Sequence, residues 1–154
     1  MEPGKRGPLE SQSRAAFIGD QHMSKIIEII NNLPELLQMQ PASDEQITAA
    51  EIDLKVCFSD EYKEYLKNFG AIMADGIELS GIAKSEYRNV ISMTKQEWEL
   101  NSNVPHTMYV IENTHIDGIV TWQDNSGCIY KTEPNKKPVK IADTMAEYLV
   151  NRCG

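Results

Sequence analysis

Two side chains in the short run THIDG are the strongest candidates for chemistry in this sequence. His115 and Asp117 lie two residues apart, where an imidazole and a carboxylate could act as a general acid/base pair. His and Asp are also common turn residues, so the same run is typical of a tight turn. We interpret the run as a turn, and catalysis by His115 and Asp117 remains the less favoured alternative.

The other histidines and the cysteines do not form a metal-binding pattern. His106 and His115 are too far apart for the HExxH spacing, which presents two ligands on one helical face. The three cysteines, Cys57, Cys128 and Cys153, are widely spaced and include no CxxC pair. We therefore expect no metal site, and we expect Cys57 and Cys128 to be reduced thiols that pack in the interior like small apolar residues.

Motifs for nucleotide or acyl chemistry are also missing from the sequence. Gly76 and Gly81 are the closely spaced glycines, and they fit neither phosphate-binding glycine motif. There is no GxSxG elbow and no phosphate-binding loop. The sequence therefore predicts a protein that is not an enzyme and that needs no cofactor.

The charge distribution is more informative than these motifs. The chain has 154 residues, with 15 Lys and Arg against 23 Asp and Glu, so its formal net charge is -8. This charge argues against binding to a nucleic-acid backbone, which needs a positive face. An acidic surface attracts basic proteins, although solvated acids that only keep the protein soluble are the alternative. No Lys or Arg occurs between Gln96 and Tyr130, but five acids do: Glu97, Glu99, Glu112, Asp117 and Asp124.

The first 22 residues differ in composition from the rest of the chain. Gly, Pro, Ser and Gln interrupt each apolar stretch, which predicts a disordered leader. His22 and Met23 resemble a cloning junction, so we interpret 1–22 as an expression tag and 23–154 as one domain; a native flexible tail is the alternative. No apolar run is long enough to span a bilayer and no secretory signal is present, which predicts a cytoplasmic protein.

Helical spacing and capping residues predict three helices before residue 70. Ser43 followed by Gln46 forms a capping box, which marks the start of a helix. Ser59 opens another helix, whose aromatic face ends at Gly70. We expect the three helices over residues 24–37, 44–55 and 59–69.

After Gly70 the pattern changes to short apolar segments separated by turn residues. We expect extended segments around 77–82 and 90–91, then a helix that a capping box of Thr94 and Glu97 begins. Asp143 should cap a final helix. The fold class is therefore α+β, with N-terminal helices, an antiparallel β-meander and a C-terminal helix. The strands of the meander are expected over 107–112, 118–122, 128–132 and 139–141, with turns at THID and QDNSG.

Several segments of this chain resemble those of the SUKH superfamily (Smi/Knr-like domains), in the family's order. The run ITAAEIDLKVCFSDEYKEYLKNFGAI is similar to the opening signature, with Glu51 inside the first helix and D-x-Y-K-x-Y-L-x-x-F-G from Asp60 to Gly70. Later segments are GIELSGI, VISMT, MYVIENTHIDGIVTW, SGCIYKT and IADTMAEYL, so the resemblance covers about 44–149. Ser59 replaces the usual proline, and the turn before the second middle strand keeps only Gly118 of its usual glycines.

The resemblance implies a function as well as a fold. Members of this superfamily are mostly bacterial immunity proteins that neutralise a cognate toxin, often a nuclease, and fungal relatives regulate cell-wall synthesis or act as scaffolds. The resemblance thus implies a partner toxin with a basic nuclease domain, stoichiometric occlusion, and no direct contact with nucleic acid or membrane. A non-catalytic interaction scaffold of the same fold is the alternative.

Candidate contact residues follow from charge and expected exposure, and no family motif assigns them. The acids near the hairpins should meet a basic partner, while neighbouring polar and aromatic side chains should add specificity. The predicted partner-binding residues are Asp75, Glu78, Glu112, Asn113, His115, Asp117, Trp122 and Asp124.

Overall fold

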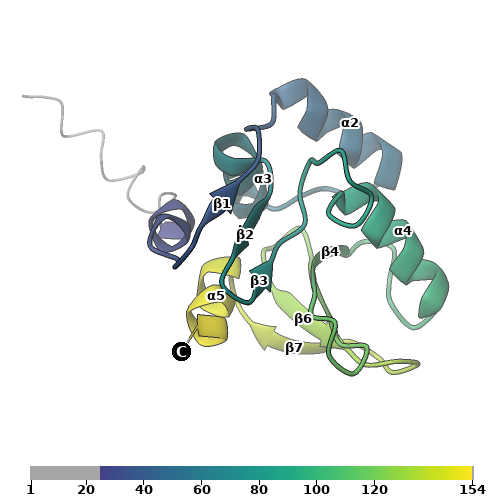
Figure 1. The fold of residues 1–154 in the computed structure, drawn as a ribbon. Helices are drawn as coiled ribbons and strands as arrows, with labels where there is room; N and C mark the ends of the chain where they lie inside the picture. The colour runs from purple at the N-terminus through teal and green to yellow at the C-terminus, as the bar shows by residue number, and fades with distance from the viewer. Residues whose placement is uncertain (1–24, 154) are drawn as a thin grey trace, which may run out of the picture.

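The computed structural model describes residues 25–153, with helices near both ends and most strands in the middle (Figure 1). The α+β class is confirmed. The predicted leader over 1–22 lies outside the described residues. After a helix over 25–31 come β1 (Leu37–Gln38), α2 (Asp44–Leu54), α3 (Asp60–Phe69), β2 (Ile72–Ala74), β3 (Ile77–Glu78), α4 (Val90–Leu100), β4 (Tyr109–Asn113), β5 (Val120–Gln123), β6 (Ile129–Thr132), β7 (Val139–Ala142) and α5 (Met145–Cys153).

The strands β4 to β7 form the predicted antiparallel meander. They neighbour one another in sequence order, and Trp122 of β5 pairs with Val110 on one side and Tyr130 on the other. The connections after β4 and β5 contain Gly118 and Gly127, whose positive φ angles of 72° and 98° suit glycine. The four predicted strands are confirmed, with small shifts at their ends.

The sequence predicts only part of the second, smaller sheet, which has the order β1-β2-β3. Leu37 is expected on a helix face. It lies instead in β1, where it pairs with Met73 of β2, and it is 61% exposed. The helix ends before Pro34, and Glu35 takes a positive φ of 56° at the turn into β1. Strands of two or three residues are too short to show an alternating pattern in the sequence. Their pairing with other strands defines them.

The prediction for the start of α4 is wrong. Residues 90–91, expected in a strand, begin this helix, and Asn89 caps it. Thr94, expected as a helix cap with Glu97, is buried inside the helix. Its Oγ1 accepts a hydrogen bond from the Val110 amide (3.0 Å), so this hydroxyl connects α4 to β4 rather than capping a helix.

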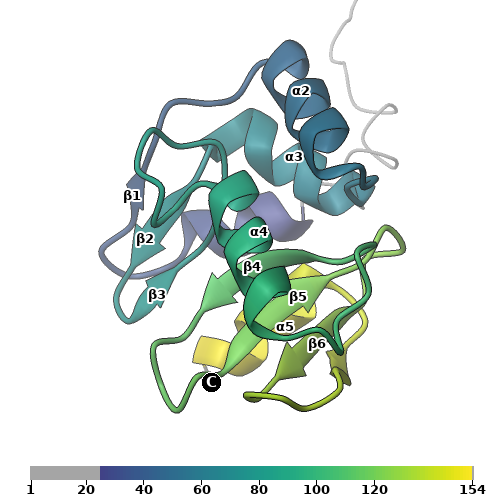
Figure 2. The ribbon, with the colours of Figure 1, turned by 90° about the vertical axis from the view of Figure 1, so that its right-hand side faces the viewer.

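The β4–β7 sheet separates two apolar cores, because successive side chains of a strand point to opposite faces. Tyr109 and Ile111 of β4 face the larger core, together with α3 and α5. Val110 and Trp122 face the smaller core, against Met93 of α4. Figure 2 shows α4 in front of this sheet and α5 behind it.

The link between α2 and α3 alternates between core and solvent. Val56 and Phe58 are buried, and Cys57 between them is exposed. The expectation of a buried Cys57 is therefore wrong, because an extended link turns alternate side chains outward. Cys128 is partly buried, and all three cysteines are free thiols.

The capping box at the start of α2 is confirmed. Ser43 Oγ accepts a hydrogen bond from the Gln46 amide (3.2 Å), and Gln46 Oε1 accepts one from the Ser43 amide (2.9 Å). We expect Ser43→Ala to lower the free energy of unfolding by about 1 kcal/mol, because a helix amide loses its acceptor. Urea unfolding followed by circular dichroism measures this change. Thr48→Ala, on an exposed position of the same helix, is the control, and an equal loss in both variants would contradict the prediction.

The start of α5 is capped by Thr144 and Glu61, and the prediction of Asp143 as the cap is wrong. Thr144 Oγ1 accepts a hydrogen bond from the Glu147 amide (3.0 Å). Glu61, from α3, accepts hydrogen bonds from the amides of residues 145–146 (2.7 and 2.9 Å). Burial raises the pKa of Glu61, although these two hydrogen bonds favour its charged form. A carboxylate on one helix thus anchors the start of another.

We expect Glu61→Ala to lower the free energy of unfolding by about 1–2 kcal/mol, because two amides of α5 lose their acceptor. The pKa of Glu61 is higher in the folded protein than in the unfolded chain. The contribution of Glu61 to the free energy of unfolding should therefore decrease as pH rises above 4.5. The difference between wild type and variant should therefore narrow with rising pH in urea unfolding. Glu64→Ala is the control on α3, and a pH-independent difference for Glu61→Ala would contradict the prediction.

Candidate partner-binding site

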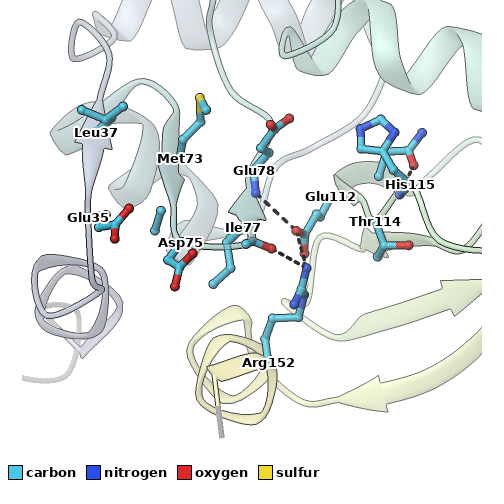
Figure 3. Close-up of a pocket in the computed structure, with 13 residues that line it drawn as sticks. Glu35, Leu37, Met73, Asp75, Ile77, Glu78, Glu112, Thr114, His115 and Arg152 are labelled. Carbon is cyan, nitrogen blue, oxygen red and sulfur yellow. Dashed lines mark hydrogen bonds and ion pairs between the residues drawn. The ribbon is translucent and has the colours of Figure 1, made fainter.

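A hollow of about 410 Å³ opens where the smaller sheet meets the end of β4 and α5 (Figure 3). Its lining comes from β1 and the preceding turn, the β2–β3 hairpin, the end of β4 with the following loop, and α5. Four carboxylates and one guanidinium line it, so we call it the acidic hollow. Its charged residues are Glu35, Asp75, Glu78, Glu112 and Arg152.

The acidic hollow brings together most of the residues that charge and expected exposure predict as partner contacts. Asp75, Glu78, Glu112, Asn113 and His115 line it. The remaining three are not part of its lining: Asp117, Trp122 and Asp124. The residues that meet here come from two hairpins distant in sequence, so only the folded chain places them on one face.

Glu112 is a buried structural carboxylate between β4 and α5, with 2% of its side chain exposed. Its Oε1 accepts hydrogen bonds from Tyr148 Oη (2.6 Å) and Arg152 Nε (3.2 Å), and its Oε2 accepts one from Arg152 Nη2 (3.1 Å). The expectation that Glu112 is exposed to a partner is therefore wrong. Its position on β4 turns the carboxylate inward, where Arg152 compensates its charge.

Tyr148 is the third member of this network. Burial, together with the neighbouring Glu112 carboxylate, raises the pKa of the Tyr148 hydroxyl, so the hydroxyl keeps its proton and donates it in a hydrogen bond. Thr121 Oγ1 of β5 in turn donates to Tyr148 Oη (3.3 Å). The network therefore joins β4, β5 and α5 beside the hollow.

The Glu112–Arg152 pair also holds the turn between β2 and β3. Arg152 Nη2 donates a hydrogen bond to the Gly76 carbonyl (2.9 Å), and the Glu78 amide donates one to Glu112 Oε2 (3.3 Å). Gly76, the second residue of this turn, has a positive φ of 74°, which glycine adopts without steric cost. Asp75 and Glu78 are both exposed, so their side chains remain in solvent while the backbone beside them is held.

Trp122 and Asp124, both predicted to contact a partner, have structural contacts instead. Trp122 is fully buried in the smaller core, so the expectation that it is exposed is wrong. Asp124 Oδ1 accepts hydrogen bonds from the amides of Ser126 (3.0 Å) and Cys128 (3.1 Å), and its Oδ2 accepts one from Tyr130 Oη (3.1 Å). Asp124 therefore stabilises the turn between β5 and β6.

The THIDG run forms a tight turn. His115 and Asp117 have positive φ angles of 59° and 53°. The His115 amide donates to Asn113 Oδ1 (2.9 Å), and Thr114 Oγ1 donates to the Ile119 carbonyl (2.8 Å). Within residues 25–153, no hydrogen bond joins the side chains of His115 and Asp117. The geometry therefore gives no support to an acid/base pair here.

The sequence did not identify Arg152, Tyr148 or Glu35 as part of this site. Arg152 and Tyr148 are four residues apart on α5, a spacing that places both side chains on one helical face. That spacing does not reveal the buried carboxylate that faces them. The dipeptide of Asp75 and Gly76 is a hairpin signal and could have located the turn.

A family model of the SUKH group, described as SMI1-KNR4 cell-wall, matches residues 23–152. The chain belongs to the SUKH family. A comparison with curated proteins finds no match. SUKH domains are generally non-catalytic folds that serve in immunity and interaction, and they commonly bind partner proteins.

Among residues 25–153, no group of three His, Cys, Asp or Glu side chains is arranged to hold a metal ion. Over the same range, no helix combines the length and the apolar character that crossing a membrane requires.

Proposed function

We propose that this SUKH domain is an immunity protein that binds a cognate toxin and neutralises it by stoichiometric occlusion. The observation that carries the proposal is the acidic hollow, where three exposed carboxylates, Glu35, Asp75 and Glu78, line one surface. The guanidinium in the lining, that of Arg152, already pairs with Glu112, so the lining has a net negative charge.

The charge of this surface fits a nuclease toxin as the partner. An enzyme that cleaves nucleic acid presents a basic cleft, because it must bind phosphates. Carboxylates on the rim of the hollow would occupy or flank such a cleft through charge complementarity. We propose Asp75 and Glu78 as the charged contacts, with Asn113 and His115 adding specificity and Asp117 on the same loop as His115 contributing further charge.

The location and the extent of the protein belong to the same proposal. A toxin that acts inside the cell must be bound inside the cell, so the protein would act in the cytoplasm. The functional unit would be the single domain over 23–154, with 1–22 as an expression tag. Because occlusion involves no turnover, one molecule of this protein would protect against one molecule of toxin.

A survival assay tests the proposal. We propose the reading frame immediately upstream of this chain's gene as the toxin; it is expressed with and without the protein, and both survival and complex formation are measured. We expect survival only in the presence of the protein, together with a one-to-one complex on size-exclusion chromatography. Equal death in both cultures would refute immunity. A complex that forms without protection would favour the interaction scaffold instead.

A further inference from the structure

Two charged residues of the proposed contact surface lie on the β2–β3 hairpin, which a partly buried ion pair helps to hold in place. Asp75 is the first residue of the two-residue turn between β2 and β3, Glu78 is the second residue of β3, and both side chains are exposed. Such short surface hairpins are mobile unless further contacts restrain them. Here the restraint comes from two side chains distant in sequence, Glu112 and Arg152, together with a hydrogen bond from the Asp75 amide to the Pro34 carbonyl (3.1 Å).

The contacts are directed at the backbone of the turn. Arg152 Nη2 lies 2.9 Å from the Gly76 carbonyl oxygen and 3.1 Å from Glu112 Oε2, so one nitrogen joins the turn to the ion pair. Glu112 Oε2 also accepts the hydrogen bond from the Glu78 amide (3.3 Å). Figure 3 shows Arg152 reaching from α5 toward Glu112 beneath this hairpin.

We propose that Glu112 and Arg152 are positioning residues that preorganise Asp75 and Glu78 for contact with the toxin. This inference rests on the proposed function. A surface whose charged groups are already in place loses less conformational freedom on binding, which favours affinity. The guanidinium is suited to this role because its fork donates to both Glu112 oxygens, through Nε and Nη2, while Nη2 also donates to the Gly76 carbonyl. A lysine ammonium has one nitrogen and cannot keep this bidentate geometry.

Two variants separate positioning from general stabilisation. Arg152→Lys keeps the positive charge but loses the fork, so it should release the turn. Tyr148→Phe removes the 2.6 Å hydrogen bond to Glu112 and leaves both contacts to the turn in place. Amide hydrogen exchange of the purified proteins should show about tenfold faster exchange at Glu78 in Arg152→Lys and little change in Tyr148→Phe.

Binding to the purified product of the upstream reading frame that we propose as the toxin provides the second measurement. Arg152→Lys should weaken binding about tenfold, and Tyr148→Phe should leave it within about twofold of wild type. When Asp75→Ala and Glu78→Ala are already present, adding Arg152→Lys should cause no further loss of affinity, because the two side chains that Arg152 positions are absent.

The outcomes distinguish the positioning role of Glu112 and Arg152 from the proposed function of the protein. Unchanged hydrogen exchange at Glu78 in Arg152→Lys would overturn the positioning role and leave the proposed function standing. A full tenfold loss that persists in the Asp75→Ala and Glu78→Ala background would also overturn the positioning role, because Arg152 would then act by another route. If wild type itself forms no complex with the product, the proposed function fails, and the role of the turn in toxin binding fails with it.

Discussion

Replacing Arg152 with methionine should lower the free energy of unfolding by about 3 kcal/mol. The substitution leaves Glu112, whose side chain is 2% exposed, as a buried carboxylate without its cation. An uncompensated buried charge costs about 3–5 kcal/mol. The Arg152 side chain is 28% exposed, so water can reach the pair from one side, which favours the lower end of that range. Urea unfolding at pH 7, followed by circular dichroism, measures the loss.

Two further variants identify the cause of this loss. Adding Glu112→Gln to Arg152→Met removes the buried charge and should restore about 1 kcal/mol or more. Lys95→Met breaks an exposed ion pair with Asp53 (2.6 Å) and should cost less than about 1 kcal/mol, because solvent screens that pair. If Arg152→Met were no more destabilising than Lys95→Met, burial of the Glu112–Arg152 pair would not matter for stability.

Reversing the charge at Asp75 and Glu78 together should weaken binding to the proposed toxin about 10²–10³-fold. Lysine at both positions would place like charges against the basic partner that we propose, which costs several kcal/mol and removes electrostatic steering. The association rate should fall, and its dependence on salt should become weaker. Both side chains are exposed, so the folded structure should tolerate the change. Stopped-flow or surface plasmon resonance measurements at several salt concentrations test the prediction.

The matched control reverses two exposed acids outside the acidic hollow. Glu86→Lys with Glu99→Lys makes the same change in net charge, and neither residue lines the hollow. This control should lower the association rate only modestly, because its charges act at a distance through screening salt. An equal loss in both double variants would show that net charge, rather than this surface, determines binding.

Features that depend on neighbours in the sequence are the ones that the sequence determined. The capping box of Ser43 and Gln46, and the cap at Ser59 followed by Gly70, predict α2 and α3 because each cap involves residues within one helical turn. The meander was predictable because hairpin turns join strands that are adjacent in the sequence. Family membership followed from the same segments in order, and the family match confirms it.

The tertiary structure alone decided which carboxylates are available to a partner. Charge counting treats Glu112 and Glu78 alike, yet one is buried against Arg152, from the far end of the chain, and the other is exposed. Trp122 and Asp124 were likewise assigned by residue type, and their burial and hydrogen bonds come from the strands beside them. Burial and pairing of a side chain depend on residues brought together by folding, so the composition of one segment cannot specify them. The sequence therefore determined the fold class and the acidic character, and the tertiary structure left Asp75, Glu78 and Asp117 as the exposed acids among those predicted as contacts.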